Sequence, residues 1–184
     1  MKINLNDIAE IKTGLVLNRK KADMSKEQKL YYSVVSLKSF NVDAVYDNSF
    51  ADEFISNEQI KEDYQVKQGD ILLRLREPNF AVYIDKEYEN LIYPSLMVRV
   101  KIQDNRFDPH FIAHYLNSHT VKKALSTELS GTTIPMINVA NVNEIKIPLI
   151  NLDKQKKIVE YLKLAHQENE LLQNLINQKQ KYSK

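Results

Sequence analysis

The sequence predicts an α+β protein, in which a β-rich domain with short helices is followed by a long C-terminal coiled-coil helix. Short β-branched and aromatic runs separated by polar turns fill residues 1–150, as expected of strands. Residues 151–184 lack glycine and proline, and their apolar residues recur every three or four positions, which predicts one uninterrupted helix. Because the composition changes between Pro148 and Asp153, we expect the domain to span residues 1–150 and the helix to span residues 151–184.

Composition excludes several classes of protein. With 184 residues, of which 43% are apolar, the chain can bury an ordinary core. No apolar run approaches the roughly 20 residues of a membrane-spanning helix, and the start of the chain lacks the apolar segment of a signal peptide. We therefore expect a cytoplasmic protein with no membrane partner. The absence of cysteine excludes disulfides, thiolate-bound zinc and thiol nucleophiles.

The first half of the domain is predicted to contain a helical turn, a strand and a short helix. Residues 5–11 are amphipathic at helical spacing, and Gly14 breaks the pattern. The β-branched and aromatic run at residues 31–37 predicts a strand. Ser56 is followed three residues later by glutamine, which is the pattern of a capping box, so we expect a helix of about two turns at residues 57–63.

Three apolar runs in the second half predict a β-meander. Residues 69–76 follow a Gly-Asp turn, and residues 80–84 follow a Pro-Asn turn. Residues 91–102 form the third run, with Pro94 near its start, where a strand tolerates proline.

Two helices are predicted after the meander. Asp108 as N-cap and Pro109 as the first helical residue introduce a helix through residues 110–118. A second helix at residues 120–129 runs into Gly131, which suits the left-handed conformation of a C-cap. The hydroxyls and backbone N–H groups around this glycine also suit phosphate oxygens, so a structural and a binding role both stay open. The residues concerned are Ser130, Thr132 and Thr133.

The C-terminal stretch carries a heptad repeat with core positions alternately four and three residues apart. These positions are Ile158, Leu162, Ala165, Asn169, Leu172 and Ile176. Asn169 occupies an a position, where a buried asparagine fixes the register and number of paired helices at some cost in stability. A helix of about 30 residues extends roughly 45 Å, which is more than a small domain needs for its core. Pairing with another chain and docking on the domain both stay open.

Motifs for catalysis are missing from the sequence. Its three glycines form no glycine-rich phosphate loop and no G-x-S-x-G or G-x-G-x-x-G pattern. His110 and His114 are one helical turn apart, a spacing that fits a shared metal ion, but no general-base glutamate follows the first. We expect these histidines to pack on the sheet, and we predict neither catalytic residues nor metal ligands.

Cationic and hydrogen-bonding residues in predicted loops are candidates for nucleic-acid contact. The net charge is +4 over residues 1–38 and −6 over residues 39–65, so the molecule can present one positive face. Residues 18–21 suit phosphate contacts, whereas Arg74 and Arg76 alternate onto one strand face, from which they would reach base edges. The full set of candidates is Asn18, Arg19, Lys20, Lys21, Lys38, Arg74, Arg76, Asn79, Ser130, Thr132 and Thr133.

The order of these segments resembles the target recognition domain of type I restriction-modification specificity subunits. In LSGTTIP followed by INVANVNEIKIPLINLDKQKKIVEYL, a Gly-Thr bend leads through a polar segment to an I-x-I-P strand and a Gln-x-x-I helix start. The matching residues are Ile145, Ile147, Pro148, Gln155 and Ile158. LNDIAEIKTG resembles the opening of such domains, GDILLRLR their central strand and YPSLMVRV the strand after it. The resemblance covers nearly the whole chain.

The resemblance implies a subunit that reads DNA and leaves the chemistry to its partners. Such subunits usually combine two recognition domains with two long conserved helices, and each domain reads one half of a split target. This sequence has one of each, so the resemblance implies a half-subunit, natural or a fragment, whose homodimer through the C-terminal helix restores the architecture. The expected partners are double-stranded DNA, a modification subunit that methylates adenine with its own S-adenosylmethionine, and a restriction subunit where one exists. No cofactor is expected on this chain.

Two other classes of function stay open on the residues alone. A coiled-coil adaptor with a β-rich protein-binding domain explains the heptads and the acidic block at residues 39–65, but not the cationic loops. A small enzyme would need a catalytic site, which we do not find. The salt dependence of affinity distinguishes the adaptor from the DNA-reading subunit. Affinity for phosphates falls steeply with ionic strength, whereas the affinity of an apolar protein interface does not.

Overall fold

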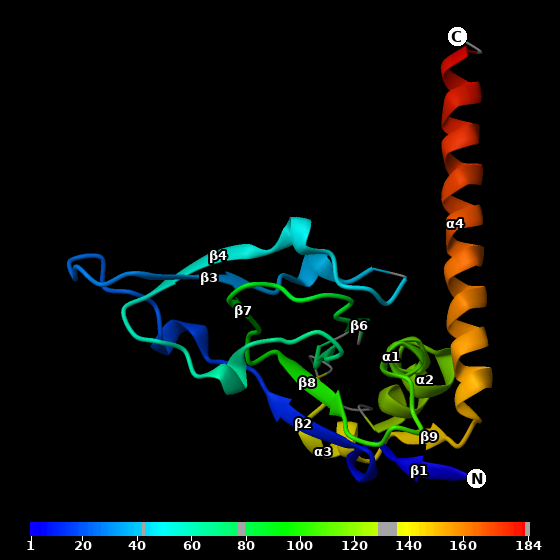
Figure 1. Cartoon of the computed structure of the whole chain (residues 1–184), viewed down its shortest axis with the longest axis horizontal. Coiled ribbons are helices and arrows are strands. Elements are labelled where there is room, and N and C mark those ends of the chain that lie inside the picture. The colour runs from blue at the N-terminus through cyan, green and yellow to red at the C-terminus, as the bar shows by residue number, and fades with distance from the viewer. Residues whose placement is uncertain (42, 77–79, 129–135, 183–184) are drawn as a thin grey trace.

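The computed structural model describes residues 1–41, 43–76, 80–128 and 136–182. It confirms the α+β class: a layered domain lies beside the lower part of helix α4 (Leu152–Tyr182), which projects well beyond it (Figure 1). Within these ranges no helix is long and apolar enough to cross a membrane.

The central sheet is antiparallel and has the order β2 (Ala9–Thr13), β8 (Met97–Ile102), β5 (Ile71–Arg74) and β6 (Ala81–Tyr83). The inner strand β5 is apolar on both faces, because Ile71 and Leu73 join one hydrophobic cluster whereas Leu72 joins another. A strand covered on both sides lacks the polar–apolar alternation of a half-exposed one. The predicted strand at residues 69–76 is therefore the middle of the fold.

A second sheet covers one face of the central sheet, with the order β4 (Asp52–Ser56), β3 (Leu30–Val34) and β7 (Leu91–Ile92). The chain passes from β7 through Pro94 into β8, so the predicted run at residues 91–102 is divided between two sheets. The predicted meander is wrong in its strand order: β6 pairs with β5 as a hairpin, but β8 lies on the other side of β5.

The crossing point of the two sheets explains Gly14. The amide of the next residue, Leu15, donates to the Tyr93 carbonyl oxygen at 2.9 Å, which brings the two backbones together. A Cβ on Gly14 would lie 2.3 Å from the Pro94 carbonyl oxygen, so no larger residue fits without displacing that strand.

The opposite face of the central sheet is covered by α1 (Pro109–Leu116), α2 (His119–Glu128), α3 (Val139–Asn143) and a small sheet of β1 (Lys2–Asn4) with β9 (Lys146–Pro148). Both predicted helices are confirmed over the described residues.

The N-cap of α1 is also confirmed. The Asp108 carboxylate accepts a hydrogen bond from the Phe111 amide at 2.9 Å, and Pro109 is the first helical residue.

Two predictions in the first half of the domain need correction. The turn at residues 5–11 is a 3-10 helix only at Leu5–Asp7, and β2 starts at Ala9. The two-turn helix predicted at residues 57–63 is wrong, because Ser56 is the last residue of β4 and only a 3-10 turn at Glu62–Tyr64 falls in this stretch. Its hydroxyl donates to the Glu58 carbonyl oxygen at 2.8 Å and accepts from the Glu58 amide at 3.2 Å, so it closes a tight turn in place of capping a helix.

The start of helix α4 is attached to the domain through one buried side chain, Gln155, which is 0% exposed. Its Oε1 atom accepts from the Asp108 amide at 2.9 Å, and its Nε2 atom donates to the carbonyl oxygens of Arg106 (2.9 Å) and Ile150 (2.7 Å). Gln155 therefore joins the start of α4 to the segment that precedes α1.

His110 of α1 packs on the edge strand β6, as expected, and His114 stacks on His110. The Tyr83 and His110 rings stack with centroids 4.9 Å apart, and the His110 and His114 rings with centroids 5.0 Å apart. Burial lowers the pKa of His110, and burial with the charge of His110 lowers the pKa of His114 to about 4. In the described part of the chain no group of three or more acidic, histidine or cysteine side chains is placed to hold a metal ion.

Replacing Gln155 with leucine should lower the free energy of unfolding by about 1–3 kcal/mol, because one buried N–H and two carbonyl groups lose their partner. Urea unfolding followed by circular dichroism measures this. Gln167→Leu, on an exposed position of the same helix, is the matched control. Equal stabilities of the two variants would contradict the structural role of Gln155.

The free energy of unfolding should fall as the pH drops from about 6.5 toward 4. The histidine pKa values in the folded state lie below the ordinary 6.5, so the unfolded state binds more protons in this window. Their contribution is complete above that window and is lost below it. His114→Phe keeps a stacked ring without the proton, and urea unfolding at several pH values should show a shallower profile. A profile identical to that of the original protein would refute the assignment.

Candidate nucleic-acid interface

The structure separates the predicted contact residues into two groups. The first, residues 18–21, lies in the connection from β2 to β3, on the side of the domain away from α4 (blue, Figure 1). The second consists of Arg74, the last residue of β5, Arg76 beyond it, and Lys38, which is two residues before the Phe40 ring that Arg74 contacts. The remaining candidates lie outside the described residues, as does Gly131; they are Asn79, Ser130, Thr132 and Thr133.

Most of the first group is exposed. Asn18, Arg19 and Lys21 are open to solvent, and Arg19 ends a 3-10 turn. Lys20 is half-buried and forms an ion pair with Glu58 at 2.6 Å. Because exposed ion pairs contribute little, this contact can be exchanged for a phosphate.

Asn57 organises the loop that follows this group, a role that sequence patterns did not reveal. Its side-chain oxygen accepts from the Asp23 amide at 2.6 Å, and its amide nitrogen donates to the carbonyl oxygens of Asp23 (3.2 Å) and Gln28 (2.7 Å). One side chain from the turn after β4 thus holds the β2–β3 connection in shape.

The members of the second group differ in exposure. The Arg74 guanidinium lies 5.7 Å from the centre of the Phe40 ring, and burial lowers its pKa, although arginine stays charged at any physiological pH. Arg76 and Lys38 are exposed, and the backbone at Arg76 bridges to Met136. Arg76 and Lys38 therefore present their charges to solvent, whereas Arg74 is held against an aromatic ring.

A further cation stands beside this group, unnoticed in the sequence. The Lys122 ammonium of α2 lies 3.7 Å from the centre of the Phe80 ring, a close cation–π contact. The Asn117 side chain accepts from the Ala81 amide at 2.7 Å and donates to the Ala81 carbonyl oxygen at 2.8 Å. Asn117 therefore satisfies the open edge of β6 and fixes the strand that carries these residues.

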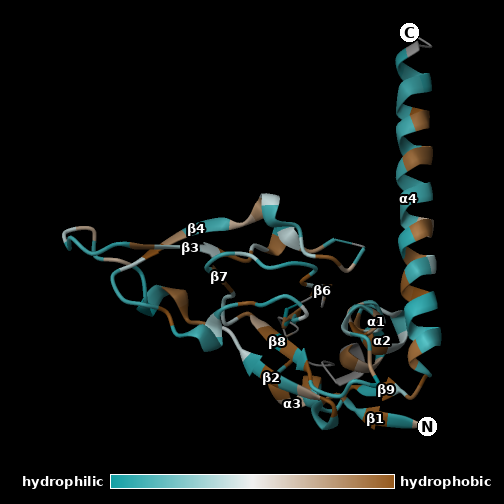
Figure 2. Ribbon diagram, in the orientation of Figure 1, coloured by the Kyte–Doolittle hydropathy of each residue, from teal (hydrophilic) through white to brown (hydrophobic). Residues whose placement is uncertain are grey.

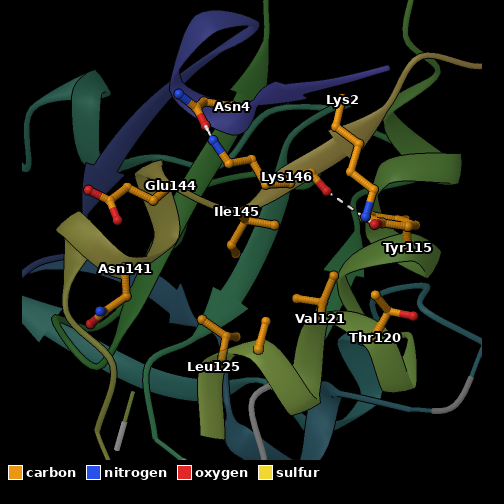
Figure 3. A pocket seen from close by; sticks show the side chains of 11 residues that line it. Lys2, Asn4, Tyr115, Thr120, Val121, Leu125, Asn141, Glu144, Ile145 and Lys146 are labelled. Carbon is orange, nitrogen blue, oxygen red and sulfur yellow. Dashed lines mark hydrogen bonds between the residues drawn. The ribbon is translucent and has the colours of Figure 1, made fainter. Parts of the chain in front are cut away.

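A separate cavity of about 440 Å³ lies among β1, β9 and the three short helices (Figure 3). Its wall includes Val121, Leu125 and Ile145, and lysines stand at its rim. The Lys146 ammonium donates to the Asn4 side-chain oxygen at 2.6 Å, and the Tyr115 hydroxyl donates to the Lys146 carbonyl oxygen at 3.1 Å. These bonds hold the small sheet to α1, and the lining includes no described member of either cationic group.

Helix α4 exposes a long apolar stripe (Figure 2). Of the predicted heptad positions, Leu162 and Ala165 are half-buried, whereas Asn169, like every described side chain of residues 167–181, is exposed. A neighbouring row absent from the predicted seam is also exposed. The apolar side chains that face solvent are Ile158 (38%), Tyr161 (70%), Leu164 (58%), Leu171 (69%), Leu172 (51%), Leu175 (51%) and Ile176 (48%). A stripe of this length marks an interaction surface.

Known proteins similar to this chain agree on one family. The sequence model described as "Type I restriction modification DNA specificity domain" matches residues 1–179. The MjaVIII specificity subunit of Methanocaldococcus jannaschii is 33% identical over 104 residues, which are 53% of this chain and 24% of that subunit.

Solved structures show the same fold. The HsdS subunit of Thermoanaerobacter tengcongensis superposes with a TM-score of 0.61 at 16% identity, over 95% of this chain and 39% of that one. The S subunit of a type I system from M. genitalium superposes with a TM-score of 0.56 at 16% identity, over 96% of this chain and 41% of that one. The chain thus spans less than half the length of each of these relatives.

Proposed function

This chain belongs to the family of type I restriction modification DNA specificity domains, and we propose that it reads one half of a split DNA target and directs a partner methyltransferase to it. The observation that carries the proposal is the family match over residues 1–179. Two groups of cationic residues on one domain, and a long helix with an unpaired apolar stripe, support it independently.

Residues 1–150 are the proposed reading domain. The exposed group at residues 18–21 contacts phosphates, which position the protein without reading sequence. Arg76 and Lys38 are exposed where the second group meets solvent, so they reach base edges in the major groove, and arginine suits guanine there. Arg74, held against Phe40, supplies charge behind them. Ser130, Thr132 and Thr133 stay candidates for further phosphate contacts.

Residues 151–184 are the proposed pairing and spacing helix. The exposed stripe of α4 is covered by the same helix of a second copy, which gives a twofold dimer with one reading domain on each side. Two identical readers held at a fixed distance bind two identical half-sites, so the target is a palindrome interrupted by a spacer of constant length.

The chemistry is proposed to lie on partner subunits. A modification subunit carries S-adenosylmethionine, flips adenine out of the duplex and methylates it, and a restriction subunit adds cleavage where one exists. The present chain supplies the address, needs no cofactor of its own and docks the modification subunit through its helical region.

Selection of bound duplexes from a random DNA library, with and without a candidate adenine methyltransferase, tests the proposal. We expect enrichment of a palindrome split by a fixed spacer. Arg76→Ala should lower the free energy by which the protein prefers one base over the others, at one position of the selected sequence, by about 1–3 kcal/mol. Lys21→Ala should weaken all sequences alike and lower the slope of log affinity against log salt by about one.

Lys61→Ala, in the acidic block, is the matched control and should change neither quantity. Two results together would overturn the DNA-reading proposal and favour a protein-binding adaptor: a DNA affinity that does not change with salt concentration, and a selection that enriches no sequence.

Asn169→Leu should keep α4 helical but permit more than one oligomeric state. In the proposed dimer Asn169 becomes buried at an a position, where a polar group selects the number of paired helices. Leu171→Asp with Leu175→Asp should give a monomer, since two charges would enter the apolar interface. Sedimentation equilibrium measures both masses, and Glu168→Gln is the control on the same helix. An unchanged mass for Asn169→Leu would exclude control by this residue, and an unchanged mass for the double variant would exclude the stripe as the interface.

A further inference from the structure

The connection between β3 and β4 presents one carboxylate, that of Asp43, to helix α4. The Asp43 amide donates to the Asn41 side-chain oxygen at 3.1 Å, and the next residue, Ala44, adopts a left-handed φ of 56°. Ala44 is 0% exposed and belongs to the main hydrophobic cluster, so the surrounding core holds this strained turn in place.

Two backbone hydrogen bonds attach the same turn to strand β6. The Tyr83 amide donates to the Ala44 carbonyl oxygen at 2.6 Å, and the Tyr46 amide donates to the Tyr83 carbonyl oxygen at 3.0 Å. Ala44 and Tyr46 are therefore held on β6 by their backbone, which gives the adjoining Asp43 a defined position relative to the sheet.

On α4, His166 meets this carboxylate. Its Nδ1 atom lies 2.5 Å from the Asp43 Oδ1 atom, and its Nε2 atom lies 3.2 Å from Glu170 Oε1, one turn further along the helix. The Asp43 and His166 side chains are 28% and 29% exposed, so the contact is partly shielded from water. A partly shielded contact between an imidazole and a carboxylate is screened less by water and salt than an exposed ion pair.

A cleft of about 410 Å³ lies beside this contact. Its lining includes His110, His114 and Leu162 as well as Asp43 and His166. The helix is thus held at Gln155 and again at His166, and Leu162 and Ala165 are half-buried between these two points. The His166 contact lies farther along α4 from its foot than Gln155, so it has the longer lever against a tilt of the helix.

The spacing of the two contacts amplifies any tilt. At 1.5 Å per residue, His166 lies about 16 Å from Gln155 and the last described turn about 40 Å from it. A displacement of 1 Å at His166 therefore moves the far end by about 2.5 Å. The end of the helix is where small changes at His166 have their largest effect.

We propose that Asp43 and His166 form a latch that sets the angle of α4 against the reading domain, and thereby the spacing of the two half-sites. The link to DNA spacing rests on the function proposed above, whereas the latch itself does not. The β3–β4 connection also carries Lys38 and Phe40, the latter under Arg74, so the latch joins a predicted reading surface to the spacing helix. Asp43 and His166 are positioning residues that need not touch DNA.

The latch can be tested by a distance measurement that requires no DNA. Because the chain has no cysteine, spin labels on Glu89→Cys in the domain and Gln178→Cys near the end of α4 are the only labels introduced. Both positions are exposed, and labelled chains diluted into unlabelled ones report distances within one copy. Pulsed electron spin resonance should give one narrow peak, which His166→Ala and Asp43→Ala each replace with a broad distribution.

Three comparisons decide the outcome. Gln167→Ala, a control in the lining of the same cleft, should keep the narrow peak. The double variant Asp43→Ala with His166→Ala should be no broader than either single variant, because both changes remove one interaction. A narrow peak in His166→Ala, or added broadening in the double variant, would overturn the latch. Circular dichroism checks that the variants stay folded. The two single variants remove the same contact, one by a change in the β3–β4 connection and the other by a change in α4.

The library selection then tests the link to spacing. The original protein should select one spacer, and His166→Ala should select several. If His166→Ala broadens the distance distribution but still selects the same single spacer, the latch holds and its role in spacing fails. If it broadens the distribution and neither protein enriches any DNA sequence, the latch holds and the proposed function fails.

Discussion

Burial of strand β5 on both faces is the constraint on which the other elements depend. Ile71 and Leu72 are 0% exposed and Leu73 is 1% exposed, so both sides of this strand must be covered. The short helices and the β1–β9 sheet cover one side, and the β4–β3–β7 sheet covers the other. The β2–β3 connection packs on the outer sheet through Leu17, whereas the foot of α4 packs through Val159 on the cluster at the opposite face of the central sheet.

Polar groups inside this apolar frame select one arrangement of its layers. Asp70, 2% exposed, accepts from the Lys67 amide at 2.8 Å, and burial raises its pKa against the opposing effects of that bond and of Arg99. Arg99, 7% exposed on β8, donates to the Gln65 carbonyl oxygen at 3.2 Å. Gln155 likewise fixes α4 by accepting a hydrogen bond from the Asp108 amide. Such groups cost free energy in any arrangement that leaves them without partners, so they restrict the alternatives more than apolar contacts do.

The two halves of helix α4 have different surroundings. Its first half docks on the domain, where Leu162 and Ala165 are half-buried, and its second half projects with Leu172 and Ile176 exposed. One heptad repeat therefore runs from a docked to an exposed part of the helix. Gln155 and His166 contact the domain from the docked part.

Local patterns in the sequence determined the α+β class, the strand at β5, the N-cap at Asp108 and a helix of full length from Leu152, because propensity, capping and periodicity act over a few residues. They also supplied the exposed cations of both groups, though not the separation between those groups. Only the tertiary structure decided the strand order, the turn at Ser56, the hydrogen bonds of Asn57 to the β2–β3 connection and the contact of Asp43 with His166. Each of these joins segments distant in sequence or replaces a local preference by a packed alternative. Such choices depend on how side chains fill the shared space between elements, and no short stretch of the chain contains that information.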